Sequence, residues 1–205
     1  MFPLFLFMSC QEDDDDNSTP DDENINYRES MRDFVIGLSD YAKRIDNSFV
    51  VIPQNGQELI TNNGEEDGTL QTAYIDAIDG TGREDFLFGY NNDDEATPSV
   101  ETEYMKGLCD LFSQNNLKDL VTAYCSTHSK MDLSYQTNES YGYISFAADE
   151  RELNSIPDYP ATPNNVNADD ITSLSPAKNF LYLINGENYA TKTDFINAVS
   201  QTNYD

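Results

Sequence analysis

The sequence predicts an α/β fold in which parallel strands alternate with helices. Stretches with an apolar residue every three or four positions alternate along the chain with short apolar runs. This alternation is typical of βαβ units, which place their strands parallel in one sheet. Four or five strands can be placed in the 205 residues, whereas a closed barrel needs eight strands and about 250 residues. The sequence therefore predicts roughly half of a (β/α)8 TIM barrel, over residues 25–205.

The first predicted helix has large apolar residues at alternating spacings of four and three positions. These residues are Tyr27, Met31, Phe34, Leu38, Tyr41 and Ile45. Such spacing is typical of an amphipathic helix. Residues 49–52 (FVVI) follow as a short buried strand that ends in the polar turn 53–56 (PQNG). A helical stretch is expected over residues 70–78, and a loop over residues 79–85.

The remaining elements follow the same alternation. A helix is expected to begin at 97–99, with its buried stripe formed by Tyr104, Leu108, Leu111 and Phe112. Further strands are expected at 120–124, 143–146 and 180–184, with a long Pro-rich and Asn-rich loop at 154–176. Thr191 is expected to cap a last helix.

The chain is strongly acidic, and this excludes some partners. There are 38 Asp plus Glu against 11 Lys plus Arg, so the formal net charge is -27. Binding to a nucleic-acid backbone needs a basic surface, so no nucleic-acid partner is expected. The charge equally disfavours docking on an anionic lipid surface. It is compatible with a cationic ligand or simply with high solubility.

The first ten residues have the character of a targeting segment rather than of a folded element. An apolar stretch, MFPLFLFM, is followed by Ser9 and Cys10. It resembles the end of a bacterial lipoprotein signal peptide, which implies a signal peptide over residues 1–9 and lipidation of Cys10. Because no run of about 20 apolar residues exists, the lipid anchor is the only membrane contact expected. The alternative is an apolar N-terminus with an incidental cysteine.

The polar run 10–24 contains the acidic stretch QEDDDD and cannot bury enough apolar surface to order itself, so we expect a disordered tether. An acidic run after the lipidated cysteine resembles the export signal of surface lipoproteins in Bacteroidetes-type bacteria. The resemblance implies an exported protein, anchored to the outer membrane at the cell surface. A generic spacer facing the periplasm is the alternative. Cys109 and Cys125 could pair in an exported protein, but with no disulfide framework visible we expect buried free thiols.

Polar residues follow most of the predicted strands, at the edge where α/β sheets build their sites. The strand ends bring together Gln54, Asn55, Ser126, His128, Asp149, Glu150, Asn185 and Glu187, with residues 79–85 nearby. His128 is the only histidine and is expected to be a structural residue. Residues 91–95 (NNDDE) lack the spacing of an EF-hand loop, so we expect a solvated loop rather than a calcium site. No metal or cofactor is expected.

Three segments occur in order along the chain: FVVIPQNG at 49–56, GREDFLFGY at 82–90 and LVTAYC at 120–125. Together they resemble glycoside hydrolase family 114, the endo-α-1,4-polygalactosaminidase-like TIM barrels. Relatives of this family are sometimes labelled cysteinyl-tRNA synthetase-like, but this chain has no HIGH-type motif and no zinc-ligand cluster. The resemblance covers most of residues 27–205, in a circularly permuted order, because 180–204 resembles the strand and helix that usually open the family barrel. The family segments with the proposed catalytic carboxylates, the strand ending in Asp, the GEAE-type and the YLD-type segments, have no counterpart in this sequence.

The resemblance implies a surface-anchored glycoside hydrolase that cleaves an amino-sugar polysaccharide. A glycosidase needs two carboxylates that flank the scissile bond, and no secure pair is visible in this chain. Glu84 and Asp79 are the best carboxylates present, and the resemblance implies that they contact the sugar or support the residues that do. The residues implied in substrate binding are Gln54, Asn55, Arg83, Glu84, Tyr90 and Tyr124. The alternatives are an ion pair with Arg83 or a helix cap for Glu84, turn stabilisation by Gln54 and Asn55, and core packing by the two tyrosines.

Two other functional hypotheses stay open at this point. The chain could be a non-catalytic glycan-binding surface lipoprotein, or it could be an inactive gene fragment. Deacetylated polygalactosamine is cationic, so an acidic cleft would attract it whether the chain is a hydrolase or a non-catalytic glycan-binding protein. A half barrel would also expose unpaired strand edges, so we expect residues 25–205 to be poorly soluble unless they dimerise.

Overall fold

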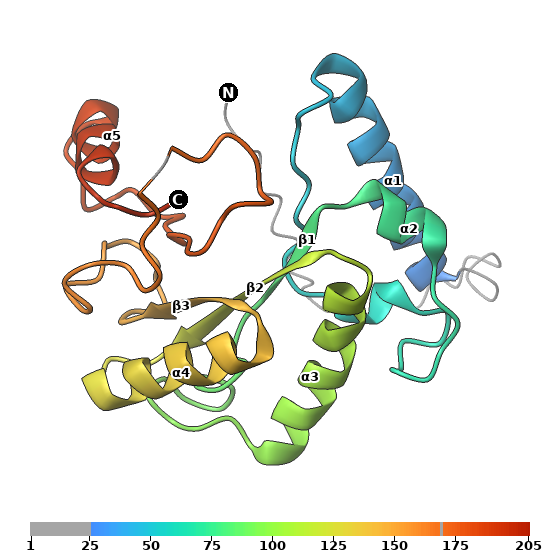
Figure 1. The fold of residues 1–205 in the computed structure, drawn as a ribbon, viewed down its shortest axis with the longest axis horizontal. Coiled ribbons are helices and arrows are strands. Elements are labelled where there is room, and N and C mark those ends of the chain that lie inside the picture. Colours follow the sequence, from blue (N-terminus) through green and yellow to red (C-terminus); the bar gives the residue numbers. More distant parts are fainter. Residues whose placement is uncertain (1–25, 169) are drawn as a thin grey trace, which may run out of the picture.

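The computed structural model describes residues 26–168 and 170–205 and has an α/β fold (Figure 1). The predicted signal peptide, Cys10 and the acidic tether lie outside the described residues. The elements, in chain order, are α1 (Tyr27–Ile45), the 3-10 helix η2 (Gln57–Ile60), α2 (Thr72–Ala77), β1 (Gly80–Arg83), α3 (Ser99–Gln114), β2 (Lys118–Tyr124), α4 (His128–Tyr141), β3 (Ile144–Ala148) and α5 (Lys192–Ser200).

The three strands form one parallel sheet in the order β1-β2-β3. Gly82 pairs with Leu120, and Leu120 in turn pairs with Ile144. Val121 and Ala123 of β2 pack on the side of helices α3 and α4, whereas Tyr124 and residues 180–182 pack on the opposite face, which we call the inner face. The predicted α/β class, with parallel strands alternating with helices, is therefore confirmed, and these three strands by themselves do not close a barrel.

Residues 51–55 run parallel to β1 without forming a regular strand. The Asp79 N–H donates to the Val51 carbonyl over 2.9 Å, and the Asn55 N–H donates to the Gly82 carbonyl over 2.7 Å. The strand predicted at 49–52 is thus replaced by an extended segment that begins later. Residues 49 and 50 remain exposed, and the hydrogen bonds to the β1 region start at Val51.

The loop predicted at 79–85 is wrong in its middle, since Gly80–Arg83 forms β1. Glycine usually weakens strands, which is why the pattern pointed to a loop. Here the two glycines permit close packing. A Cβ on Gly80 would lie 2.6 Å from the Lys118 carbonyl oxygen, and the Gln54 side chain occupies the space where a Cβ of Gly82 would sit.

Helix α1 is confirmed, but its apolar stripe does not face the core. The residues of α1 that are buried are Arg32, Val35 and Ser39. The Arg32 guanidinium donates to the backbone carbonyls of Leu59, over 2.7 Å, and Thr61, and burial lowers the pKa of Arg32. The helix therefore attaches through hydrogen bonds to the η2 region, and the stripe predicted from sequence remains at the surface.

Two other helices differ from the sequence analysis in detail. The buried residues of α3 are Met105, Leu108, Cys109 and Phe112, while Tyr104 is exposed and Leu111 is only partly buried. Helix α4 was not predicted at all. Its buried residues are Met131, Ser134, Tyr135 and Asn138, so half of its packed stripe is polar. The Asn138 Nδ2 amide donates to Ser145 Oγ over 2.9 Å, so this helix face is held partly by polar contacts, which an apolar pattern does not reveal.

The strand predicted at 180–184 is wrong, because these residues follow an irregular path. The N–H groups of Ile184 and Asn185 both donate to the Leu153 carbonyl over 3.1 Å, rather than to a neighbouring strand. Phe180 and Tyr182 pack on the inner face instead. The irregular stretch at 154–176, the cap of α5 by Thr191 and the buried free thiols Cys109 and Cys125 are confirmed.

Candidate functional site

Asn55, Glu84 and Tyr124 meet at the carboxyl ends of neighbouring parallel segments, and we call them the strand-end cluster. The Asn55 Nδ2 amide donates to Glu84 Oε2 over 3.0 Å, and the Glu84 N–H returns a bond to Asn55 Oδ1 over 3.2 Å. The Tyr124 hydroxyl donates to Glu84 Oε1. Each oxygen of the Glu84 carboxylate thus accepts a hydrogen bond from a different strand end.

The alternation of side chains along the strands explains this meeting. Successive residues of a strand point to opposite faces, so Gly82 and Glu84 share the inner face while Arg83 points outward. Tyr124 also lies on the inner face, and there it packs with Phe146 and Ala148. Asn55 turns toward Glu84 because its backbone is left-handed, with φ of 60°, a conformation that Asn tolerates better than most residues.

The cluster is partly shielded from water. Tyr124 is buried, and Glu84 and Asn55 are half-buried. Burial, followed by the hydrogen bond to Glu84, raises the pKa of Tyr124. Burial and the charge of Glu84 also raise the pKa of Tyr182, which joins the cluster from the irregular stretch. Both phenols therefore stay protonated near neutral pH and remain available as hydrogen-bond donors.

Arg151 supplies a positive charge beside the strand-end cluster. Its guanidinium carbon lies 4.0 Å from the centroid of the Tyr124 ring, a cation–π geometry. Its Nη2 lies 3.0 Å from Asp85 Oδ1 and donates to the Gly89 carbonyl over 2.7 Å. A further ion pair joins it to Asp93 at 2.7 Å. Sequence analysis missed Arg151, although it directly follows Asp149 and Glu150 at the end of β3.

Gly89 of the GREDFLFGY segment is required by this arrangement around Arg151. Its φ is 114°, outside the range of most L-residues. A Cβ at this position would lie 2.7 Å from Asp85 Oδ1 and 3.0 Å from Arg151 Nη2. The glycine of the motif therefore allows the Asp85–Arg151 ion pair to form beside Tyr124.

Asp79, the second candidate carboxylate, lies at the opposite end of β1. It accepts a hydrogen bond from the Val51 N–H over 2.8 Å and pairs with Lys43 at 3.0 Å. Glu84 lies five positions further along the chain, which corresponds to roughly 16 Å along a strand. Paired glycosidase carboxylates lie about 5–9.5 Å apart. The structure therefore does not bring Asp79 and Glu84 together.

The other predicted binding residues lie around the cluster at different depths. Arg83 points to the helix side of the sheet, where it bonds Gln57 Oε1 over 3.2 Å and Met105 Sδ over 2.8 Å. It makes no ion pair with Glu84 in the described residues. Gln54 is exposed, with its side chain over Gly82. Tyr90 is 44% exposed, so its ring is open to a ligand.

Two other strand-end residues predicted from sequence, Ser126 and His128, have structural partners. His128 stacks on Tyr159 with ring centroids 3.9 Å apart. Asp94 accepts from the N–H groups of Ser126 and Thr127, over 3.0 and 2.9 Å, and pairs with Lys130 at 2.8 Å. The hydrogen bond from Lys130, followed by those from Thr127, lowers the pKa of Asp94. Through Asp94, the acidic stretch at 91–95 stabilises the amino-terminal end of α4.

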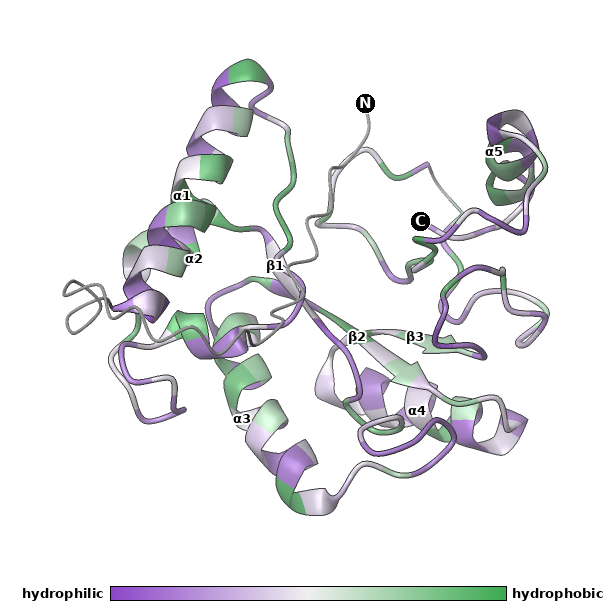
Figure 2. Cartoon of the chain, turned by 180° about the vertical axis from the view of Figure 1, so that it is seen from behind, coloured by the Kyte–Doolittle hydropathy of each residue, from purple (hydrophilic) through white to green (hydrophobic). Residues whose placement is uncertain are grey.

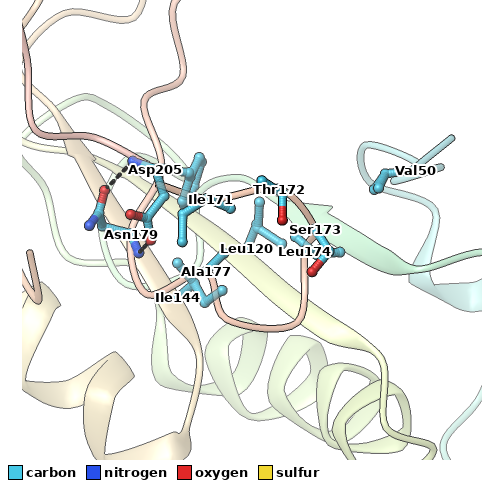
Figure 3. Close-up of a pocket in the computed structure, with 11 residues that line it drawn as sticks. Val50, Leu120, Ile144, Ile171, Thr172, Ser173, Leu174, Ala177, Asn179 and Asp205 are labelled. Atoms are coloured by element: carbon cyan, nitrogen blue, oxygen red, sulfur yellow. Dashed lines mark hydrogen bonds between the residues drawn. The ribbon is translucent and has the colours of Figure 1, made fainter. Parts of the chain in front are cut away.

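A separate cavity of about 290 Å³ lies on the inner face, nearer the amino ends of β2 and β3 (Figure 3). Leu120 and Ile144 line it from the sheet, and Ile171, Leu174 and Ala177 line it from the irregular stretch. Its lining is mainly aliphatic. Leu120 lies four residues before Tyr124, roughly 13 Å along the strand, so the cavity is distinct from the strand-end cluster.

The cluster offers a carboxylate, an amide, phenols and a guanidinium within one patch. This set can accept hydrogen bonds from hydroxyl or ammonium groups and can stack against a ring. Among residues 26–168 and 170–205, no group of three or more His, Cys, Asp or Glu is arranged to hold a metal ion. No helix there combines the length and apolar character needed to cross a bilayer.

Comparison with known proteins adds no relative to this picture. No protein-family model and no curated protein matches the chain.

Proposed function

We propose that this chain binds an amino-sugar polysaccharide at the strand-end cluster, as the recognition face of a half barrel of glycoside hydrolase type. The observation that supports this most is Glu84, a carboxylate at the carboxyl end of a parallel strand that accepts hydrogen bonds from Asn55 and Tyr124. Exposed Tyr90 and the Arg151–Tyr124 stack add an aromatic and a cationic element nearby. A protonated amino sugar fits the charge of Glu84 and the net charge of -27.

Hydrolysis is the second candidate activity, and the resemblance to family 114 favours it. In that case Glu84 is the carboxylate that faces the glycosidic bond, and a second carboxylate must lie about 5–9.5 Å from it. Asp79 lies at the far end of β1, where it pairs with Lys43, so it is too distant to be that second carboxylate. Binding without cleavage therefore agrees better with the geometry of this chain.

Replacing Glu84 by Gln is expected to weaken binding of deacetylated polygalactosamine by about 10- to 100-fold, since a hydrogen bond to a charged group contributes roughly 1.5–3 kcal/mol. Gln keeps the shape and removes the charge. Calorimetric titration of the full chain measures the affinity, and reducing-end assays on the same mixtures report any cleavage.

Asp79→Asn is the matched control, because it removes one carboxylate from the opposite end of the same strand. It is expected to bind the polymer like the unmodified chain. Equal loss in both variants would mean that only bulk charge matters. Release of new reducing ends by the unmodified chain, abolished in Glu84→Gln, would establish the hydrolase reading instead.

We also propose that the chain is exported and carries a lipid on Cys10, which tethers it to the outer membrane at the cell surface. The support is the apolar stretch before Cys10 and the acidic run after it. Expressed in a bacterium that processes lipoproteins, the chain should incorporate labelled palmitate, and Cys10→Ala should abolish the label. Cys109→Ala, at a buried thiol, should keep it. Label retained by Cys10→Ala would refute the anchor.

A further inference from the structure

A stripe of large apolar side chains runs along the exposed face of α1, and we call it the α1 stripe. Its members are Tyr27, Met31, Phe34, Leu38, Tyr41 and Ile45, each between 50% and 69% exposed. Figure 2 shows hydrophobic residues along this helix at the outer edge of the molecule. Exposed apolar residues are ordinary when scattered, but a contiguous patch of this size marks an interaction site.

The α1 stripe is exposed because the helix is held by its other face. Arg32 bonds the Leu59 and Thr61 carbonyls, and Ser39 Oγ donates to the Ala77 carbonyl over 2.5 Å. Lys43 reaches the same Ala77 carbonyl over 3.0 Å. Rotating the helix to bury the stripe would break all of these bonds and would leave buried carbonyls unpaired, which costs about 1–3 kcal/mol each. The outward orientation is thus fixed by the fold itself.

The spacing of the α1 stripe specifies the kind of partner. Steps of four and three residues repeated over 19 residues are the a/d pattern of two helices that pack along each other. Taking about 150–250 Å² for each of the three aromatic side chains and somewhat less for the three aliphatic ones, the stripe exposes on the order of 600 Å² in total. A standard interface takes about 800 Å² from each partner. The α1 stripe alone therefore approaches the area that one side of such an interface needs.

Charge selects a second copy of this chain as the partner. Helix α1 carries four Lys or Arg residues against three Asp or Glu, and because Arg32 is buried the charges on its exposed surface balance, whereas the whole chain carries -27. Four of the 11 basic residues therefore lie on this one helix. Two copies that approach through other surfaces bring together acidic patches, which repel. Two copies that approach through α1 meet where this repulsion is weakest.

We infer that two copies of the chain pair through the α1 stripe, in a two-fold symmetric helix–helix interface. In such an interface the same patch is used by both subunits. The central residues of the stripe, Phe34 and Leu38, pack at the middle of the pair. The strand-end cluster stays free on both subunits, since its residues lie at the end of the sheet and not on α1.

The test is the solution mass of the full chain and two double variants, measured by light scattering over a range of concentrations. Phe34→Glu with Leu38→Glu places two charges at the centre of the stripe. Val100→Glu with Ile196→Glu is the matched control, because these residues are also apolar and at least half exposed, but on α3 and α5. Circular dichroism verifies that both variants keep their helices.

The unmodified chain and the control are expected to have twice the monomer mass of 23.1 kDa, and the stripe variant is expected to be monomeric. A stripe variant that stays dimeric would place the interface elsewhere, for example at a strand edge, and would overturn the inference. A monomeric unmodified chain at tens of micromolar would overturn it too, and would mean that another part of the same chain covers the α1 stripe.

Discussion

Replacing Asp119 by Asn is expected to make the protein progressively more stable than the unmodified chain as the pH rises from 4.5 to 8. Asp119 is the second residue of β2, its carboxylate contacts Ser113 of α3, and it is only 2% exposed. Its Oδ2 accepts a hydrogen bond from Ser113 Oγ over 2.5 Å, but its Oδ1 has no partner. Burial, supported by the charge of Asp110, raises the pKa of Asp119 to about 7.

The sign of the pH dependence follows from that raised pKa. Between the unfolded pKa of about 3.9 and the folded value of about 7, the unfolded chain releases a proton that the folded chain retains. The unfolded state then binds fewer protons, so the free energy of unfolding falls as the pH rises. The stability that protonated Asp119 contributes is complete below pH 4 and is lost once the pH has passed 7. Each pKa unit corresponds to 1.36 kcal/mol, so the change between pH 4.5 and 8 is about 3 kcal/mol.

Urea unfolding at pH 4.5 and pH 8 measures this effect as a difference between variant and unmodified chain. Asn cannot ionise, so the difference in free energy of unfolding should shift by about 3 kcal/mol in favour of Asp119→Asn at the higher pH. Glu103→Gln, which neutralises an exposed carboxylate on α3, controls for the relief of net negative charge. A shift of the same size in both variants would show that the acidic surface, and not Asp119, causes the pH dependence.

Regular helices with an apolar period could be predicted from sequence, but their orientation could not. The pattern of α1 was read correctly, yet polar Arg32 and Ser39 face the core because they bond backbone carbonyls of η2 and α2. Hydropathy does not record such bonds. The same limit hid α4, where Ser134 and Asn138 occupy the packed face. The local pattern predicts the element type where an apolar period is present, as in α1 and α3, whereas the choice of face depends on contacts far away in the chain.

The strand-end cluster was predicted in part, for a related reason. Asn55, Glu84 and Tyr124 each follow or end an extended segment, so topology alone places them at one edge of the sheet. Arg151 is bound to Asp85 across 66 residues, and no local pattern reveals that pairing. The glycine-containing segment between Asp79 and Glu84 predicts a loop, in which the two carboxylates could lie close together. Once Gly80–Arg83 forms a strand, the two carboxylates are necessarily far apart.

Phe146→Ala is expected to cost about 3–5 kcal/mol, a large part of the roughly 5–15 kcal/mol that stabilises an ordinary domain. Phe146 is 1% exposed on the inner face of β3. Its ring centroid lies 5.6 Å from that of Phe180 and 6.1 Å from that of Tyr204. These contacts hold residues 177–205 against the sheet, and Tyr182 reaches the strand-end cluster from this segment.

The variant should therefore loosen the carboxyl-terminal segment before the rest of the fold unfolds. Native-state hydrogen exchange can follow the amides of Ile184 and Asn185, which donate to the Leu153 carbonyl. Phe112→Ala is the matched control, because it truncates an equally buried ring in the cluster under α1. It should lower global stability by a similar amount and leave these two amides protected at low denaturant. If both variants expose Ile184 and Asn185 equally, the segment and the sheet unfold as one unit, and Phe146 has no special role in supporting the site.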